Sequence, residues 1–329
     1  MRVAVLGAGA WGTALACALA ARNDTLLWAR DAAQASAMAH GRRNERYLAG
    51  QTLPPELQVQ GSLESAVAHA RGGLLLLAVP LASLRPLLQA VKALQYSGSL
   101  AWLCKGLERT SSQLAHQIVA SELPGVPAGP LSGPSFAQEV VRGLPTALVV
   151  AGTAELCASV TAAVHGGNLR VYSTDDVVGV EIGGAVKNVL AIGTGIADAL
   201  SLGLNARAAL MTRGLSETRR LGVALGARPD TFTGLTGMGD LILTCTGDLS
   251  RNRQVGLGLG RGTPLAQIIA ELGHVAEGVW SAPAIVARAR ENSVEMPICE
   301  TVCAVLEARL GAREAVERLL ARDPRSEHA

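Results

Sequence analysis

The feature that most constrains the fold is a set of three glycines close to the start of the chain. The sequence GAGAWG, residues 7–12, follows the short apolar stretch 3–6 and leads into TALACALAA, a segment of strong helix-forming residues. The order of strand, glycine turn and helix predicts the opening of a βαβ unit. A secretory signal is the weaker interpretation, because signal segments tend not to carry three glycines at this spacing.

Each glycine of this turn has its own physical role. Gly7 permits the tight turn, Gly9 lets the backbone approach a pyrophosphate, and Gly12 allows the helix to pack closely on the strand. The free N–H groups of the helix N-terminus then face the anion. The motif therefore predicts that the chain binds an adenine dinucleotide, in either the flavin or the nicotinamide form.

Strand and helix patterns alternate up to about residue 175 and then change. Strands are expected at residues 3–6, 25–29, 74–79, 100–104, 126–131, 145–151 and 169–173. Helices are expected among them at 31–40, 110–121 and 154–165, with a short one capped by Ser62. After residue 177 the apolar residues recur only at helical spacing, and helices are expected at 178–200, 205–225, 239–245, 250–259, 264–272, 278–292 and 297–310. We predict an α/β Rossmann-type domain over residues 1–177, an all-α domain over 178–329 and a solvated tail from 323.

Composition narrows the class of protein. The 329 residues are enough for about two domains of roughly 150 residues each. A formal net charge of +2 is too small to provide a nucleic-acid-binding surface by itself. The six cysteines form no CxxC pair and no cluster with histidine at metal-ligand spacing, which indicates reduced thiols in a cytoplasmic protein. No apolar run is interpreted as a membrane span.

Lysine is rare in this chain, which has 26 arginines and only three lysines, at 92, 105 and 187. The retained lysines can therefore reflect a need for amine chemistry. Lys187 lies in a long expected helix whose neighbouring positions on the same face are mostly small, which leaves room for a ligand. Burial there would lower the pKa of the lysine and suit it to proton transfer. The alternative is a closely packed helix with its lysine directed to solvent.

Two candidate site segments follow neighbouring strands of the expected sheet. Lys105 ends one strand, at the edge where open α/β sheets bind ligands. The loop SGPSF, residues 132–136, leaves the same edge and offers backbone N–H groups and a hydroxyl. The alternatives are a solvated loop lysine and a proline turn that binds nothing.

The segment GLTGMGDLILTCTGDLSRNR combines a glycine-rich turn with a potential anion site. Asp240 is its single acid in apolar surroundings. Ser250 is expected to cap a helix that begins with Arg251 and Asn252, and an arginine and an amide at a helix N-terminus suit a phosphate. A charged, solvated turn is the alternative.

The end of the second expected strand indicates which nicotinamide cofactor is preferred. NAD-selective proteins usually place an acidic side chain there, whereas this chain has Arg30, followed by Asp31. Arg30 suits the 2′-phosphate of NADPH, and Asp31 is either a helix cap or a weak ribose acceptor. We predict NADPH as the preferred cofactor, with NADH not excluded.

Taken in order, these motifs resemble those of bacterial NAD(P)-dependent sn-glycerol-3-phosphate dehydrogenases. The likeness runs from Met1 to about Leu320 through GAGAWGTALA, CKGLE, LSGPSFAQEV, GLPTA, VYSTDDVVGVEIGGAVKNVLAIGTGI, GLTGMGDLILTCTG and SRNR. The resemblance implies Lys187 as the catalytic proton carrier. It implies substrate binding by Lys105, Gly133, Ser135, Lys187, Asp240, Ser250, Arg251 and Asn252. Besides the three glycines, it implies cofactor contacts at Ala10 or its neighbour Trp11, Arg30, Lys105, Ala137, Arg251, Val275 and Glu277.

The resemblance also implies a helical domain like that of 6-phosphogluconate dehydrogenase. The implied reaction is the reversible reduction of dihydroxyacetone phosphate to sn-glycerol 3-phosphate for glycerophospholipid synthesis, in the cytoplasm and without a metal. Lys105 would support the developing oxyanion, Asp240 would orient a lysine or a substrate hydroxyl, and Arg251 with Asn252 would hold the phosphate. The apolar helical surface leads us to expect a homodimer.

Two other functions remain open at this point. A related two-domain dehydrogenase acting on a 3-hydroxy acid or a 2-ketoacid derivative would share the fold, although the SRNR segment and the second lysine argue against it. A dinucleotide sensor would bind the cofactor without turnover, and Lys105, Lys187 and Asp240 would then have no required chemistry.

Overall fold

The computed structural model describes residues 1–273 and 276–321, and the expected tail lies outside the described residues. Within that part of the chain, one eight-stranded sheet has the order β3-β2-β1-β4-β5-β6-β7-β8. The strands are β1 (Arg2–Leu6), β2 (Asp24–Trp28), β3 (Gln58–Gln60), β4 (Leu74–Leu77), β5 (Ser99–Trp102), β6 (Ala128–Ser132), β7 (Thr146–Ala151) and β8 (Leu169–Thr174). All pairings are parallel except that of β6 with β7. The first six strands follow the Rossmann order.

Helices cover both faces of this sheet, because successive strand residues point to opposite sides. Val3 and Val5 of β1 belong to the core under α1 and α7, whereas Ala4 and Leu6 belong to the core under α3, α4 and α5. These helices are α1 (Ala10–Ala20), α2 (Ala32–Gly41), α3 (Leu63–His69), α4 (Leu84–Ala93), α5 (Ala115–Glu122), α6 (Ala137–Val141) and α7 (Ala154–Val164). β4 is buried along its whole length, as expected for a strand covered on both faces.

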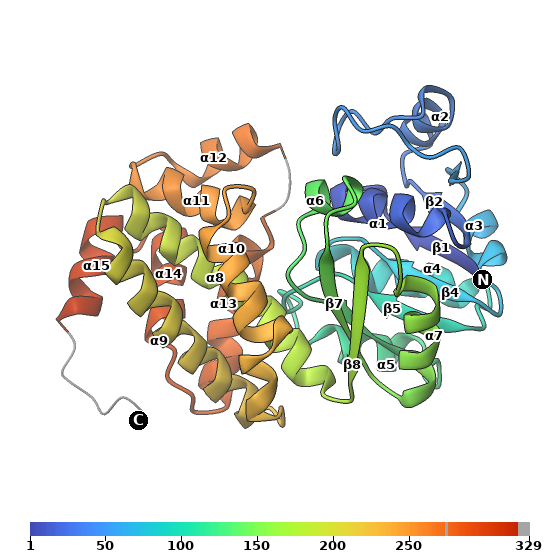
Figure 1. Cartoon of the computed structure of the whole chain (residues 1–329). Coiled ribbons are helices and arrows are strands. Elements are labelled where there is room, and N and C mark those ends of the chain that lie inside the picture. The colour runs from blue at the N-terminus through green and yellow to red at the C-terminus, as the bar shows by residue number, and fades with distance from the viewer. Residues whose placement is uncertain (274–275, 322–329) are drawn as a thin grey trace.

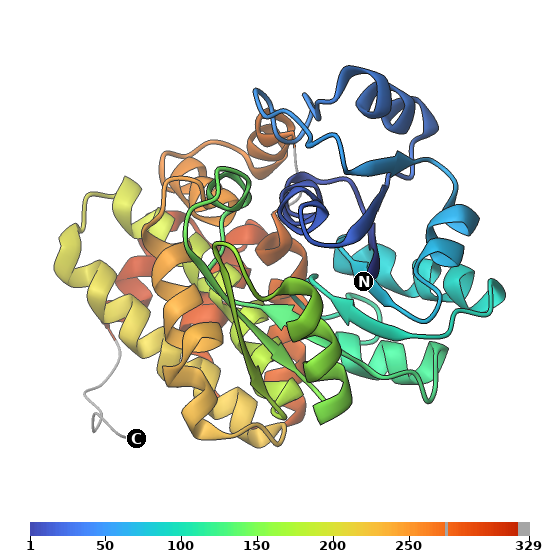
Figure 2. The same cartoon turned by 45° about the vertical axis from the view of Figure 1, so that its right-hand side comes forward.

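The rest of the described chain is helical and lies beside the sheet (Figures 1 and 2). The helices are α8 (Val177–Ala199), α9 (Gly203–Ala224), α10 (Asp240–Thr246), α11 (Arg251–Gly260), α12 (Leu265–Leu272), α13 (Glu277–Glu291), α14 (Pro297–Leu306) and α15 (Ala312–Leu320). Short 3₁₀ and π-helical segments, Pro229–Thr233 and Leu235–Gly239, precede α10. The α/β Rossmann-type fold followed by a helical domain, predicted from the sequence, is confirmed.

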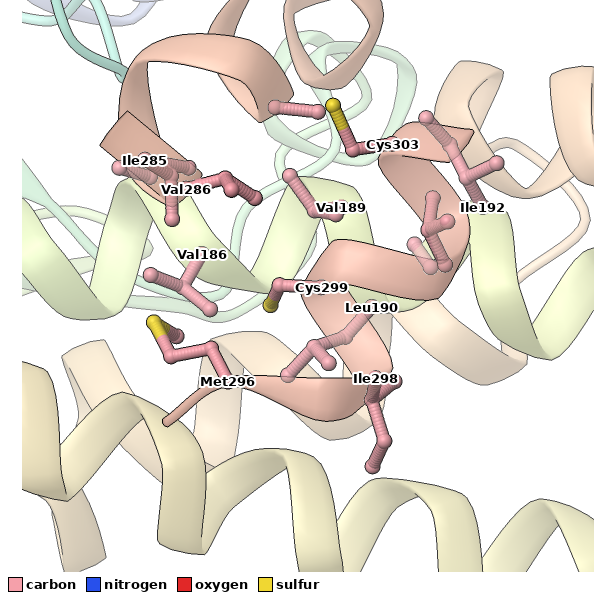
Figure 3. Packing of buried hydrophobic residues seen from close by; sticks show 14 of the residues in the cluster. Val186, Val189, Leu190, Ile192, Ile285, Val286, Met296, Ile298, Cys299 and Cys303 are labelled. Atoms are coloured by element: carbon pink, nitrogen blue, oxygen red, sulfur yellow. The ribbon is translucent and has the colours of Figure 1, made fainter. Parts of the chain in front are cut away.

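Helix α8 forms the centre of the helical half. Its apolar side chains pack against Ile285 of α13, Cys299 of α14 and Met296, which directly precedes α14 (Figure 3). α8 is long and apolar enough to cross a membrane by length and composition, but 89% of its most apolar window is buried inside the protein. It is therefore the core helix of this half.

The glycines of α8 mainly serve the packing of helices. A Cβ on Gly195 would lie 2.2 Å from the Arg253 carbonyl oxygen of α11, and one on Gly183 would lie 2.5 Å from the Thr236 carbonyl oxygen. At Gly193 it would meet the Val302 side chain of α14 at 3.2 Å. Of these three glycines only Gly183 lies on the face of Lys187, and there the interpretation of small residues as space for a ligand is wrong; the lysine itself is buried and does not point to solvent.

Several boundaries differ from those expected. The helix expected at 110–121 begins only at Ala115, because Ser111 bonds to Glu108 and organises the preceding segment as a loop. The helix expected at 297–310 ends at Leu306, shortly before Ala308 adopts a left-handed φ of +55°. The sequence patterns did not predict β3, α6, α15 or the π-helical turn. The first two have only three and five residues, too few to show a period.

Candidate active site

Two lysines and one aspartate from distant parts of the chain meet in the protein interior. Lys105 Nζ lies 2.7 Å from Asp240 Oδ2, and Lys187 Nζ lies 2.5 Å from Asp240 Oδ1. Lys105 follows β5, Lys187 lies in the middle of α8 and Asp240 is the first residue of α10. Their side chains are 13%, 8% and 2% exposed, respectively. The structure thus brings together the expected proton carrier Lys187, the lysine expected to support the oxyanion and the aspartate expected to orient a lysine or substrate hydroxyl.

Burial and charge act in opposite directions on these groups. Burial lowers the pKa of the Lys187 ammonium to about 7, and neighbouring Lys105 adds to this shift while Asp240 opposes it. Burial alone would raise the pKa of the Asp240 carboxyl, but the two ammonium groups outweigh this effect and hold the pKa below its usual range. An ionised aspartate between two lysines leaves one positive charge in excess.

Thr244 belongs to this cluster, and the sequence interpretation missed it. Lys187 Nζ donates to Thr244 Oγ1 at 2.9 Å, and the threonine hydroxyl donates to the Asp240 carbonyl oxygen at 2.6 Å. The available signal was its position four residues after Asp240, on the same face of α10. Thr244 therefore fixes the direction in which the lysine ammonium points.

A close contact between α8 and the π-helical turn brings Asp240 to Lys187. Gly183 lies against the Thr236 carbonyl group, and Gly237 packs so closely on Phe232 that an added Cβ would lie 2.2 Å from its carbonyl oxygen. Only glycine permits both approaches. The glycine-rich sequence GLTGMGD thus sets the start of α10 beside the middle of α8.

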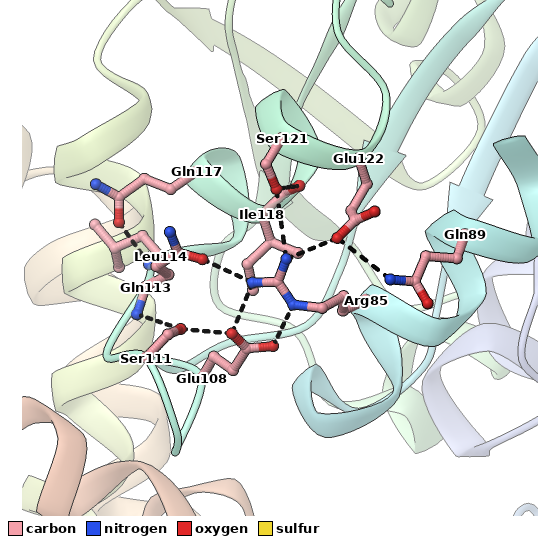
Figure 4. A network of polar contacts seen from close by, with 10 residues as sticks. All are labelled: Arg85, Gln89, Glu108, Ser111, Gln113, Leu114, Gln117, Ile118, Ser121 and Glu122. Atoms are coloured by element: carbon pink, nitrogen blue, oxygen red, sulfur yellow. Dashed lines mark hydrogen bonds and ion pairs between the residues drawn. The ribbon is translucent and has the colours of Figure 1, made fainter.

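The loop that carries Lys105 into α5 is held by Arg85 of α4 (Figure 4). Its guanidinium makes a bidentate contact with Glu108, through Nε at 2.9 Å and Nη2 at 2.7 Å, and also contacts Gln113 and Glu122. The pairing with Arg85 lowers the pKa of the Glu108 carboxyl. The planar guanidinium thus forms several hydrogen bonds at once and holds the loop at both Glu108 and Gln113.

The residues expected to hold phosphate lie at the start of α11. Ser250 caps the helix, as predicted, with its Oγ accepting the Arg253 N–H at 3.3 Å. Arg251 is exposed. Asn252 is buried; its side chain donates to Asn188 Oδ1 at 2.9 Å and accepts the Gly278 N–H at 3.0 Å. One amide hydrogen of Asn252 is then left for a ligand, so much of its role is to join α11 to α8 and α13.

The glycine turn fits a dinucleotide pyrophosphate. Gly7 has a φ of +124°, and a Cβ there would lie 2.4 Å from the Ala78 carbonyl oxygen. A Cβ on Gly12 would lie 2.0 Å from the Gly7 carbonyl oxygen, whereas Gly9 faces open space with nothing within 4 Å. Ala10 and Trp11 open α1, whose N-terminus has no side-chain cap. Its N–H groups therefore remain available to an anion.

Arg30 and Asp31, which follow β2, have different roles in the structure. Arg30 is exposed. Asp31 caps α2, with Oδ1 accepting the N–H groups of Ala33 at 2.9 Å and Gln34 at 3.3 Å. The structure thus favours the capping interpretation of Asp31 over that of a ribose acceptor, and leaves Arg30 as the side chain that could meet a 2′-phosphate.

The remaining expected positions lie at the ends of neighbouring elements. Gly133, with a φ of +133°, follows β6 and accepts a hydrogen bond from Ser135 Oγ at 3.1 Å, and Ala137 begins α6. Glu277 begins α13; burial raises the pKa of its carboxyl, and Arg251 and Lys105 oppose the shift, so it lies near both cations. Val275 lies outside the described residues. Within the described residues, no group of three or more His, Cys, Asp or Glu side chains could hold a metal ion.

A Rossmann sheet with a dinucleotide-binding glycine turn, joined to a helical domain with a buried lysine, is typical of two-domain dinucleotide-dependent dehydrogenases. The chain belongs to the NAD-dependent glycerol-3-phosphate dehydrogenase family: the model of the family's N-terminal part matches residues 2–158, and that of its C-terminal part matches residues 176–317. The resemblance inferred from the motifs is thereby confirmed.

Relatives along the full length agree with this assignment. The chain is 56% identical to a glycerol-3-phosphate dehydrogenase (NAD(P)+) of Methylibium petroleiphilum, over 99% of this chain and 98% of that protein. It is 57% identical to the protein of the same name from Janthinobacterium, with both chains fully covered. The crystal structure of the glycerol-3-phosphate dehydrogenase of Coxiella burnetii superimposes with a TM-score of 0.93 at 40% identity, over 97% of this chain and 98% of that one.

Proposed function

We propose that this chain reduces the ketone of dihydroxyacetone phosphate and that Lys187 gives the proton to the carbonyl oxygen. The chain is an oxidoreductase of its family that uses NADPH or NADH, and the reaction is the reversible formation of sn-glycerol 3-phosphate. The observation that carries the assignment of roles is the single buried aspartate shared by two lysines. A bound dihydronicotinamide supplies the hydride.

The lysine pair provides both the proton and the charge that the reaction needs. With a pKa of about 7, Lys187 can donate its proton near neutral pH and recover it afterwards. Lys105 keeps a second positive charge beside the oxygen on which negative charge develops. Asp240 and Thr244 hold the Lys187 ammonium in one orientation, so that little reorganisation is needed when the proton moves.

Arg251 is the proposed phosphate ligand. It is exposed at the first residue of α11, where the unpaired N–H groups of the helix also favour an anion. Asn252 supplies its remaining amide hydrogen, and Ser250 its hydroxyl hydrogen, because the capping bond uses only the oxygen. Gly133 and Ser135 are proposed to contact the rest of the substrate.

The proposed cofactor contacts are the glycine turn, Ala10 or Trp11, Arg30, Ala137, Glu277 and Val275. Arg30 supports a preference for NADPH, because a guanidinium complements a phosphate and Asp31 is engaged in capping. We further propose a division into domains at residue 177, a homodimer, a cytoplasmic location, and a role in supplying glycerophospholipid synthesis.

The test is the oxidation of NADPH at 340 nm with dihydroxyacetone phosphate and the purified protein. Lys187→Met should reduce kcat by at least about 100-fold while NADPH still binds, because the direct proton donor is lost. Lys92→Met is the matched control: this lysine is exposed on α4, and its loss should leave turnover unchanged. Near-normal turnover of Lys187→Met with only a raised KM would overturn the proposed role.

A further inference from the structure

Every reduction of a ketone by hydride also consumes one proton, so the proton donor must be reloaded after each turnover. This step matters here because Lys187 is nearly enclosed, with its ammonium bonded to Asp240 and Thr244. Lys105 shares Asp240 with it and lies on the side of the cluster nearer the sheet. A proton that reaches Lys105 can therefore pass through the Asp240 carboxylate to Lys187.

A small cavity adjoins Lys105. It measures about 10 Å³, close to the least volume that holds one water molecule. Its lining residues are Cys104, Lys105, Gly106, Ala115, Pro130, Leu131, Ser132, Val180 and Glu181. The Ser132 hydroxyl is buried and has no hydrogen-bond partner among the described residues. Ser132 Oγ and Lys105 Cγ each lie 3.4 Å from the position that a Cβ on Gly184 would take, so the two side chains are neighbours.

Glu181, on the same cavity, connects it to a histidine at the protein surface. Its side chain is 5% exposed, and one carboxylate oxygen accepts the backbone N–H of His116 at 2.9 Å. The other oxygen contacts Nδ1 of the His116 ring. The His116 side chain is 30% exposed, so the imidazole reaches solvent while its inner nitrogen faces the buried carboxylate. The only polar side chains that line the cavity are those of Lys105, Ser132 and Glu181, apart from the thiol of Cys104.

We propose that His116, Glu181 and Ser132 form a proton-uptake route that reloads the lysine pair. This inference rests on the proposed role of Lys187. A proton from solvent binds the outer nitrogen of His116, and the ring releases its Nδ1 proton to Glu181. Glu181 passes a proton through one water molecule, held by Ser132, to Lys105 as Lys105 gives its own proton to Asp240 Oδ2. Rotation of the neutral Asp240 carboxyl then turns this O–H toward the Lys187 amine, which takes the proton and leaves the carboxylate ionised. Only N–H and O–H bonds form and break, and one proton enters for each one delivered to the substrate. Between turnovers the partly exposed imidazole exchanges protons with solvent and regains the tautomer that carries its proton on Nδ1.

A purely structural role for Glu181 predicts something different. Glu181 also caps α5 by accepting the N–H of its second residue. That bond uses the backbone of His116 and survives any change of its side chain. Substitution of the imidazole therefore separates proton transfer from helix capping.

The experiment compares His116→Ala with the unchanged protein at saturating dihydroxyacetone phosphate and NADPH in weak buffer. We expect kcat to fall about tenfold, less than the loss of the direct donor causes, with KM unchanged. The solvent deuterium isotope effect should increase, and added imidazole should restore turnover. His40→Ala removes an exposed histidine of α2 and serves as the matched control, with neither effect.

A second variant tests the buried end of the route. Ser132→Ala removes a hydroxyl without leaving any described group unpaired, so we expect the fold and KM to persist and the solvent isotope effect to rise.

An unchanged kcat and isotope effect in His116→Ala, or a loss that imidazole does not restore, would refute the route. If Lys187→Met is inactive while His116→Ala is normal, only the route fails; if Lys187→Met stays active, the proposed proton donor fails as well.

Discussion

The pKa of Lys187 should govern how the two directions of the reaction depend on pH. Reduction needs the protonated ammonium, and burial lowers the pKa of this group to about 7. We therefore expect kcat/KM for dihydroxyacetone phosphate to be full below about pH 7 and to fall up to tenfold per pH unit above it. Oxidation of sn-glycerol 3-phosphate needs the neutral amine and should rise over the same range. Initial rates between pH 5.5 and 9 measure both; a flat reduction profile would contradict the assignment.

Arg251 should determine how well the protein distinguishes a phosphorylated substrate. Arg251→Ala removes a charged hydrogen-bonding partner of the phosphate, a contact worth about 1.5–3 kcal/mol. We expect the ratio of kcat/KM for dihydroxyacetone phosphate over unphosphorylated dihydroxyacetone to fall by at least about tenfold. Arg261→Ala is the control, because Arg261 is exposed at the other end of α11. An undiminished ratio would remove the proposed phosphate role.

Arg30 should set the preference between the two nicotinamide cofactors. Its guanidinium is exposed directly after β2, and the neighbouring Asp31 is committed to the cap of α2. Arg30→Ala should weaken NADPH binding about tenfold or more and leave NADH binding within about twofold, because only NADPH carries the 2′-phosphate. Titrations with each cofactor measure the two dissociation constants. Tighter binding of NADH than NADPH by the unchanged protein would contradict the preference.

At the scale of elements, the contact between α8 and α11 is the one that aligns Lys187 with Arg251. Gly256 of α11 lies against α8, and a Cβ there would stand 2.0 Å from the Ile192 carbonyl oxygen. Alanine normally stabilises a helix relative to glycine by about 1 kcal/mol, but here it must push two backbones apart. We expect Gly256→Ala to reduce the free energy of unfolding by about 1–3 kcal/mol and to raise the KM for dihydroxyacetone phosphate.

Thermal unfolding and initial rates test this prediction together. Gly41→Ala is the matched control, because Gly41 ends α2 with nothing within 4 Å of an added Cβ. That variant should keep its KM and should melt at an equal or slightly higher temperature, because alanine is favoured over glycine in a helix. Equal stability of the two variants would show that α8 and α11 can separate at no cost.

The elements differ in how far the sequence could predict them. β4 was predictable because the apolar run LLLL is bounded by Gly73 on one side and stops close to Pro80 on the other. The glycines of α8 were ambiguous, because room for a ligand and close packing on another helix require the same small residues. The three-residue β3 was missed because its pairing with β2, rather than any internal pattern, makes it a strand.

The candidate site was also only partly predictable from the sequence. Its lysines stood out in a chain with few of them, and Asp240 stood out as an acid in apolar surroundings, but the sequence pattern did not show that both lysines share this aspartate. Asp240 is 53 residues from Lys187 and 135 from Lys105 along the chain, so its position depends on the tertiary contact at the π-helical turn. The Glu181–His116 pair joins α8 to α5 and could not be found from the sequence pattern for the same reason.

For the whole molecule, the junction between the sheet and the helical half is tightly fixed. Asp176, between β8 and α8, accepts the N–H of Gly179 at 2.9 Å and that of Arg228 at 2.9 Å, and the hydroxyl of Thr231 at 2.5 Å. Val180 of α8 also packs on Val149 and Ala151 of β7. α8 therefore continues from the sheet into the helical core without a loose linker, and Lys187 keeps its place relative to the edge that carries Lys105.

Apolar side chains on the outside of the helical half lead to a prediction about assembly. Leu202 and Leu204 are exposed near the turn between α8 and α9, Leu204 by 73%, and Val223 is exposed farther along α9. We expect light scattering to give twice the chain mass of 33.8 kDa, because a homodimer would cover such residues.

Burial of one leucine contributes about 1.5–3 kcal/mol, and a two-fold interface includes it twice. Leu204→Arg should therefore raise the dissociation constant at least about 100-fold, whereas Leu320→Arg, on exposed α15, should not. A monomer of the unchanged protein at micromolar concentration would contradict this prediction.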